Sequence, residues 1–405
     1  MSADLAATGL DVTDLRGWGY LARDAMLGLV GVVESMHHNI ARAPGILGAP
    51  AQGRTRGITG LVYGTIRGVT RLVGAGFDAA LAPLAREDRE RLRSAKREAL
   101  VAALNGVVGD HLAATKNPLA IPMRFRRGGR ALPLDSAALA AALPEAGPRP
   151  VVLVHGAFMN DLRWLRGGHD HGAALARDLG RTPVYLHYNT GLHVSTNGRA
   201  LSAALEALVR AWPVPVEELA IVAHSMGGLV ARSACLHAEA AGRAWRRRLK
   251  ALIFLGTPHH GAPLARGGHW VDAALSVSPY SAPIARLGRI RSAGITDLRH
   301  GSLVDEDWSG RDRFAPAQPL PRAVPLPAGV ACCTVAAIRA RRGGGAARFV
   351  GDGLVPVDSG LGRHADLRRA LAFAESRRWV ATGIDHFDLL SDGKVYQRLR
   401  AWLAN

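Results

Sequence analysis

The sequence predicts an α/β fold in which a mostly parallel sheet has helices on both faces, preceded by an all-helical region. From Leu119 onward, short and fully apolar runs alternate with helical stretches. Such runs are typical of strands in a parallel sheet that is buried on both faces. Before Leu119, apolar residues recur at helical spacing, and no strand pattern interrupts them. With 405 residues, 48% of them hydrophobic, the chain can bury a large core.

The helical region, residues 1–118, contains three amphipathic stretches, which cover residues 17–41, Val62–Leu84 and Leu100–His111. We expect their apolar faces to pack within the protein, which is the usual fate of such faces. The alternative is that the first stretch lies on a lipid surface, although its polar side has no excess of Lys and Arg. The apolar positions that share one face of this first stretch are Leu21, Ala25, Leu29, Val32, Met36 and Ile40.

The second region, residues 119–405, is predicted to form the sheet. Ile121–Phe125 and Arg130–Leu134 flank a Gly128-Gly129 pair, which indicates a hairpin. Residues of about 261–327 are rich in Gly, Pro, Ser and Arg and are too long for a plain connection, so we expect a cap or lid. The remaining strands are predicted at Val151–Val154, Val184–Leu186, Leu219–Ala223, Leu252–Leu255, Val330–Ala336 and Trp379–Thr382.

The charge balance does not favour a nucleic-acid partner. Lys and Arg number 51 against 33 Asp and Glu, a formal charge of +18. The excess is almost entirely Arg, and its tightest runs, 246–248 and 339–342, are short and have no aromatic residues among them. A nucleic-acid surface would normally combine a basic stripe with stacking aromatics. We therefore expect no nucleic-acid binding.

Cysteine usage and hydropathy point to the cytoplasm. The three cysteines form neither a disulfide framework nor a CxxC pair, which favours a reducing compartment. The N-terminus lacks the basic segment of a signal peptide, and no apolar run reaches the length of a membrane span. The expected location is the cytoplasm, with peripheral membrane contact through the N-terminal helices as the alternative.

The segment around Ser225 carries the clearest chemical signal. A buried strand ends at His224, and a helix begins directly after the serine with Gly227 and Gly228 in its first turn. This is the strand–turn–helix context of a nucleophile elbow, in which small residues two before and two after the serine avoid steric clashes. Ala223 and Gly227 occupy those positions. The sequence therefore predicts Ser225 as a nucleophile at the positive end of a helix.

These residues resemble the α/β-hydrolase superfamily, in particular its bacterial esterase and lipase branch, over roughly residues 119–405. The segment Pro150–Phe158 resembles the turn that builds half of the oxyanion hole in those enzymes. The resemblance implies that the backbone amides of Ala157 and Met226 hold the oxyanion, with Phe158 as the alternative to Ala157. The segment Phe254–Gly261 resembles a strand-end signature of lipases related to the GPI inositol-deacylases.

The resemblance also implies a catalytic triad in the order serine, acid, histidine, because a serine needs a base that a third group orients. Asp352 lies between two glycines and matches the acid loop of the family. Asp358 is the alternative acid, although its place after Pro356 is typical of a turn or helix cap. His386 follows the last predicted strand and matches the base of the family.

Other side chains are candidates for substrate contact. Tyr188 and Asn189 follow a predicted parallel strand, and loops at that end of a strand line the crevice of α/β sheets. Phe158 and His259 are assigned to the substrate pocket, with a structural role as the alternative for His259. We expect His155 and His224 to pack beside the catalytic turns.

No metal site is predicted. His169 and His171 are two residues apart at a helix start, which does not let them face one ion easily, and no third ligand is spaced nearby.

The function predicted from these motifs is hydrolysis of carboxylic esters through a Ser225–His386–Asp352 triad and an acyl-enzyme. The chemistry requires no cofactor. The expected partner is a small-molecule or lipid ester. An acyltransferase, a thioesterase or a catalytically silent binding protein on the same fold are the alternatives.

Overall fold

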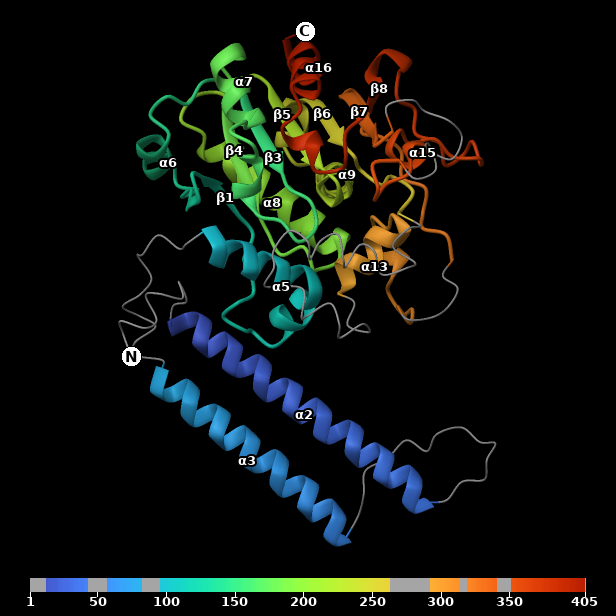
Figure 1. Ribbon diagram of the computed structural model, residues 1–405. Coiled ribbons are helices and arrows are strands. Elements are labelled where there is room, and N and C mark those ends of the chain that lie inside the picture. Colours follow the sequence, from blue (N-terminus) through green and yellow to red (C-terminus); the bar gives the residue numbers. More distant parts are fainter. Residues whose placement is uncertain are drawn as a thin grey trace. The chain divides into compact units, whose positions relative to one another are not determined.

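The computed structural model describes residues 12–42, 57–81, 95–262, 292–313, 319–340 and 351–404. The chain divides into two compact units (Figure 1). The first consists of Met1–Arg97 with Ala114–Leu119, and the second of Glu98–Ala113 with Ala120–Asn405. This division differs from the predicted boundary at residue 118, because residues 98–113 group with the second unit.

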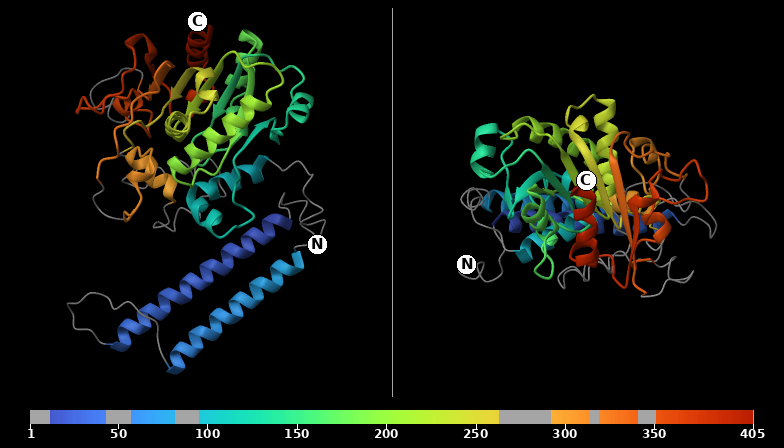
Figure 2. Two further views of the ribbon diagram at one scale, coloured as in Figure 1. Left: turned by 180° about the vertical axis from the view of Figure 1, so that it is seen from behind. Right: turned by 90° about the horizontal axis from the view of Figure 1, so that it is seen from above.

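The described part of the second unit contains an eight-stranded sheet in the order β2-β1-β4-β3-β5-β6-β7-β8 (Figures 1 and 2). Strands β3 to β8 are parallel, whereas β1 pairs antiparallel with both β2 and β4. A mostly parallel sheet preceded by a helical region confirms the predicted fold class. The parallel strands are β3 Pro150–Val154, β4 Thr182–His187, β5 Leu219–His224, β6 Leu249–Leu255, β7 Ala331–Ile338 and β8 Arg378–Thr382.

Helices cover both faces of the sheet. Helices α8 (Val194–Ala211) and α9 (Met226–Ala240) pack on one face, where their Leu and Val side chains meet alternate residues of β3 and β5. Helices α7 (His171–Leu179) and α16 (Gly393–Ala404) pack on the other face. Strands β3 and β5 are buried along their whole length. Apolar side chains on both faces of these strands explain why they appear in the sequence as unbroken apolar runs.

The predicted hairpin is confirmed, with shorter strands than expected. Strand β1 covers Arg124–Arg127 and β2 covers Arg130–Ala131. Gly128 and Gly129 form the turn with φ angles of 56° and 76°, which a residue with a side chain rarely adopts.

Helix α5 (Ala95–Ala114) contains the third predicted helical stretch and is bent at Val108. The part of α5 that belongs to the second unit, residues 98–113, is held by hydrogen bonds. Asn189 donates a hydrogen bond to the Gly109 carbonyl oxygen at 2.8 Å, and Ser292 donates to the Gly106 carbonyl oxygen at 2.6 Å. A Cβ atom on Gly109 would lie 1.9 Å from the Asn189 side-chain oxygen, so this close approach requires a glycine.

The first two predicted stretches form α2 (Val12–Arg42) and α3 (Gly57–Leu81) of the first unit. Among the residues that the structure describes, no helix is both long enough and apolar enough to cross a bilayer.

The predicted cap contributes α13 (Ala293–His300) and the short helix η3 (Asp305–Asp307). Its residues 263–291 and 314–318 lie outside the described part of the chain. The other described elements are α6 Ser136–Ala142, η1 Asp161–Trp164, α10 Trp245–Arg248, α15 Val357–Gly360, η4 Glu375–Arg377 and η5 Asp388–Leu390.

The buried His171 should make the second unit sensitive to acid. Its Nε2 donates to the Leu389 carbonyl oxygen at 2.9 Å, and burial lowers its pKa to about 4. Below about pH 6.5 the unfolded chain binds a proton that the folded chain does not, so the free energy of unfolding falls as the pH drops. We expect His171→Gln to weaken the pH dependence of Tm between about pH 7 and pH 5. The exposed His111→Gln is the control; equal slopes for the two variants would contradict the prediction.

Candidate active site

Ser225 occupies a strained turn between β5 and α9. Its φ and ψ angles are 54° and −124°, which places a residue other than glycine in a sparsely populated region. The turn is held because the Ser225 amide donates to the Leu255 carbonyl oxygen at 2.8 Å. The Ser225 hydroxyl is buried and has no hydrogen-bond partner among the described residues. The turn therefore presents an unengaged hydroxyl above the carboxyl end of the sheet.

The first turn of α9 approaches the end of β3 closely. A Cβ atom on Gly227 would lie 2.6 Å from the carbonyl oxygens of Val154 and His155. Both neighbours are backbone atoms, which cannot move aside as a flexible side chain can. Ala223, the other predicted small residue, is fully buried. The predicted requirement for small residues around the serine thus has a direct steric cause.

His386 and Asp352 form a buried pair. His386 Nδ1 lies 2.7 Å from Asp352 Oδ2, and each residue is 2% exposed. The other carboxylate oxygen of Asp352 accepts the backbone amides of Leu354 at 2.9 Å and Val355 at 2.8 Å. With Nδ1 donating to the carboxylate, Nε2 is the ring atom that can accept a proton.

A small cavity brings the predicted nucleophile and base together. It has a volume of about 10 Å³ and is lined by Gly156, Ala157, Met159, His224, Ser225, Leu354, His386 and Phe387. Asp358, the alternative acid, lies in the first turn of α15, and the carboxylate that contacts the imidazole is that of Asp352. Asp352 thus contacts His386, and His386 and Ser225 line the same cavity.

The backbone amides predicted for the oxyanion hole differ in their hydrogen bonds. The Phe158 amide donates to the Thr190 hydroxyl at 3.1 Å, so it is already engaged. The amides of Ala157 and Met226 donate to no described acceptor. This favours the predicted pair, Ala157 and Met226, over the alternative with Phe158. The Phe158 ring instead contacts α5, where a Cβ atom on Gly106 would lie 2.2 Å from it.

Tyr188 and Asn189 are placed differently from the prediction that they contact substrate. Tyr188 is fully buried; its hydroxyl donates to the His155 carbonyl oxygen at 2.9 Å, and its ring stacks on His155. Asn189 is also buried; besides its bond to Gly109, its side-chain oxygen accepts the Gly191 amide at 2.9 Å. Neither lines the cavity at Ser225. Their contacts hold the loops after β3 and β4, because buried polar groups must be paired.

His259 also lies away from the cavity, and its surroundings are structural. Its ring packs edge-on against Phe254, and its Nδ1 is 3.5 Å from a guanidinium nitrogen of Arg232. Burial lowers the pKa of His259 well below its ordinary value, so the ring is neutral. Burial also lowers the pKa of Arg232 to about 10, and Arg232 donates to the Val324 carbonyl oxygen.

His224 has a more specific position than the sequence indicated. Its Nε2 donates to the His386 carbonyl oxygen at 3.0 Å, and the two rings are 4.6 Å apart. Burial holds the pKa of His224 well below the ordinary histidine value, so the ring stays neutral. His224 therefore holds the loop that carries His386. The position of His224 directly before Ser225 is the sequence signal that could have indicated this role.

No group of three possible metal ligands occurs among the described residues. His169 Nε2 and His171 Nδ1 lie 2.8 Å apart and hydrogen-bond to each other.

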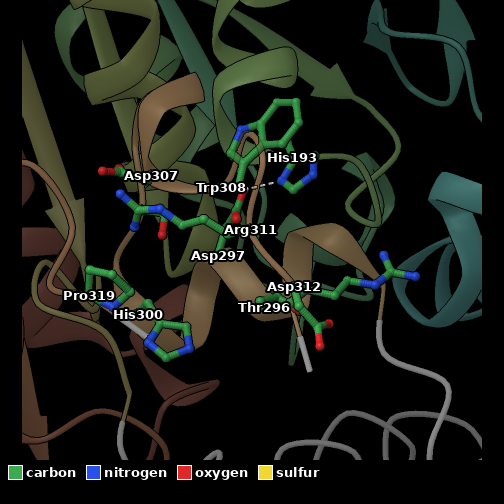
Figure 3. A pocket seen from close by; sticks show the side chains of 11 residues that line it. His193, Thr296, Asp297, His300, Asp307, Trp308, Arg311, Asp312 and Pro319 are labelled. Atoms are coloured by element: carbon green, nitrogen blue, oxygen red, sulfur yellow. Dashed lines mark hydrogen bonds and ion pairs between the residues drawn. The ribbon is translucent and has the colours of Figure 1, made fainter. Parts of the chain in front are cut away.

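A larger cavity of about 280 Å³ lies beside the cap helix α13 (Figure 3). It contains a His193–Asp297 pair with 3.0 Å between Nδ1 and Oδ2, and Trp308 stacks on His193. None of the predicted site residues lines it.

Comparison with known proteins identifies a family. Residues 83–288, about half of the chain, match the family model described as "Domain of unknown function (DUF7379)". The chain belongs to this family. No curated protein matches it.

Solved structures with a similar fold include the mature lipase BlEst2 of Bacillus licheniformis, 20% identical, covering 63% of this chain and 91% of that chain with a TM-score of 0.40. The esterase Pf2001 of Pyrococcus furiosus is 12% identical and covers 64% of this chain and 81% of its own, with a TM-score of 0.37. Mouse alpha/beta hydrolase domain-containing protein 10 is 14% identical. The similarity covers 63% of this chain and 87% of that chain, with a TM-score of 0.33.

The close approach at Gly227 predicts that one added methyl group lowers the stability of the protein. Gly227→Ala should lower the free energy of unfolding by about 1–3 kcal/mol or more, because backbone oxygens of β3 must move. Gly393→Ala is the matched control, since a Cβ atom there meets nothing within 4 Å. Urea unfolding measures both variants; equal stabilities would show that the turn tolerates a side chain.

Proposed function

We propose that this protein is a serine hydrolase that cleaves carboxylic esters, with Ser225 as nucleophile, His386 as base and Asp352 as the group that orients the base. The observation that carries the proposal is the cavity that Ser225 and His386 share beside Ala157. The backbone of Ser225 is strained there, and the imidazole of His386 contacts the Asp352 carboxylate. A serine that served only packing would not need a backbone conformation of this cost.

The proposed reaction begins with Ser225 Oγ attacking the ester carbonyl carbon while His386 Nε2 accepts the hydroxyl proton. The carbonyl oxygen becomes an oxyanion, to which the amides of Ala157 and Met226 donate. His386 then gives its proton to the leaving alkoxide, which departs as an alcohol and leaves an acyl-Ser225 ester. Water, deprotonated by the same imidazole, attacks this ester and releases the acid. Asp352 holds the ring and stabilises its charged form.

The walls of the cavity support a substrate with an apolar acyl group. Met159, Leu354 and Phe387 present apolar side chains beside Ser225. A volume of about 10 Å³ holds no more than one water molecule, so an ester enters only when these walls move. Lipase, esterase and thioesterase substrates all meet this description, so the acyl chain length is left to the assay below.

The nucleophile is tested by a fluorophosphonate probe and by p-nitrophenyl esters of graded chain length. We expect the probe to label Ser225, and Ser225→Ala to abolish labelling and lower kcat by at least about 10³-fold, because the covalent step is lost. Circular dichroism establishes that the variant is folded. A native chain that neither labels nor hydrolyses any ester would support a binding protein on this fold. Adding an acceptor alcohol distinguishes an acyltransferase.

The acid is tested by comparing two aspartates of the same region. Asp352→Asn should lower kcat about 10²–10⁴-fold, since the imidazole loses the carboxylate that sets its tautomer. Asp358→Asn is the matched control and should keep its activity. An inactive Asp358→Asn beside an active Asp352→Asn would reassign the acid.

A further inference from the structure

Helices α2 and α3 of the first unit direct their charges toward each other. The two helices run side by side (Figures 1 and 2). Arg16 of α2 pairs with Asp78 of α3 at 2.6 Å, and Arg67 of α3 pairs with Glu34 of α2. Glu34 is only 3% exposed. The described contact between the helices therefore includes ion pairs, one of them with a buried carboxylate.

The outward side of α3 is apolar instead. Leu61, Val69 and Leu72 are 71%, 55% and 74% exposed, and further exposed apolar residues lie between them. The spacing places them in one stripe along the helix. We call this surface the outer stripe; its members are Leu61, Val62, Ile66, Val69, Leu72 and Val73.

Helix α2 continues the same pattern. Its exposed described residues are Ala22, Ala25, Met26 and Gly28. Among all exposed side chains described for α2 and α3, that of Arg71 is the only charged one. The chain as a whole is 21% charged, so this composition is not a general property of the protein.

This distribution is the reverse of a helix pair that is stable in water. Such a pair buries its apolar faces and exposes its charges, because apolar burial drives association and ions prefer water. A helix pair in contact with hydrocarbon must instead satisfy its polar groups internally, since no water is available outside. A continuous exposed apolar surface on a folded unit marks an interaction site.

We propose that the outer stripe and the exposed face of α2 bind the surface of an anionic phospholipid bilayer, with the helices lying in the interface. The exposed apolar residues of α3 share one stripe along the helix, which fits a flat surface. Arg67, Arg71 and Asp78 limit the apolar side of α3 to one stripe, as in helices that lie in an interface. The formal charge of +18 adds attraction to an anionic leaflet.

The test is flotation of the full chain with vesicles of phosphatidylcholine mixed with phosphatidylglycerol. We expect the chain to float with these vesicles and to remain bound at high salt, because apolar insertion is not screened. The combined variant Val62→Gln, Val69→Gln and Leu72→Gln should reduce binding roughly tenfold or more, since it removes apolar area without adding charge.

The matched control changes two exposed leucines of the second unit. Leu320 and Leu367 are 72% and 85% exposed, so Leu320→Gln and Leu367→Gln remove similar area away from the outer stripe. This control should float like the native chain. The proposal holds whether or not Ser225 is catalytic, and esterase assays without vesicles keep the two questions separate.

Four outcomes would overturn the proposal. Absence of flotation by the native chain excludes the bilayer as the occupant, and equal flotation of the combined Gln variant excludes the outer stripe as the surface that binds it. A lipid-free dimer that the combined variant converts to a monomer, without flotation, would assign the outer stripe to a second copy of the chain. A lower Tm of that variant, without flotation, would show that the stripe packs within the protein.

Discussion

The position of Ser225 in the second unit depends on the close packing of α9 against the end of β3. Because Gly227 has no side chain, the first turn of α9 can approach the Val154 and His155 carbonyl oxygens. That approach leaves Ser225 in a left-handed conformation directly above the sheet, beside the loop that contains Ala157. The same contact brings the Met226 amide to the start of a helix, where backbone amides point outward and favour negative charge. One steric allowance thus positions both Ser225 and the Met226 amide.

His386 reaches this place by contacts that come from three different strand ends. Asp352 follows β7 and holds the ring of His386, which itself follows β8. His224, at the end of β5, holds the carbonyl group of the same residue. The carboxyl ends of parallel strands meet at one edge, so residues distant in the sequence converge there. Burial keeps His224 neutral, which lets it act as a hydrogen-bond donor without adding charge beside the imidazole.

The two units differ in where their described apolar side chains lie. The second unit has an apolar core, and its buried histidines, such as His155 with its pKa lowered to about 3, are kept neutral. In the first unit, the described contact between α2 and α3 contains ion pairs and the outer stripe is apolar. Burial of apolar side chains favours folding in water, whereas an exposed apolar stripe marks a surface for interaction, on which the bilayer proposal rests.

The sequence by itself determined the features that local chemistry imposes. Unbroken apolar runs predicted the parallel strands, and Gly128-Gly129 predicted the hairpin. Both signals are local, because the hydrophobic pattern of a strand and the backbone freedom of glycine are visible within a few residues. The small residues around Ser225 identified its turn for the same reason. Tertiary structure alone decided the direction in which side chains point: Tyr188 and Asn189 turn inward to hold loops, and the apolar face of α3 turns outward. It also grouped residues 98–113 with the second unit. A periodic pattern shows that a helix has an apolar face. What that face packs against is decided by contacts between residues far apart in the chain.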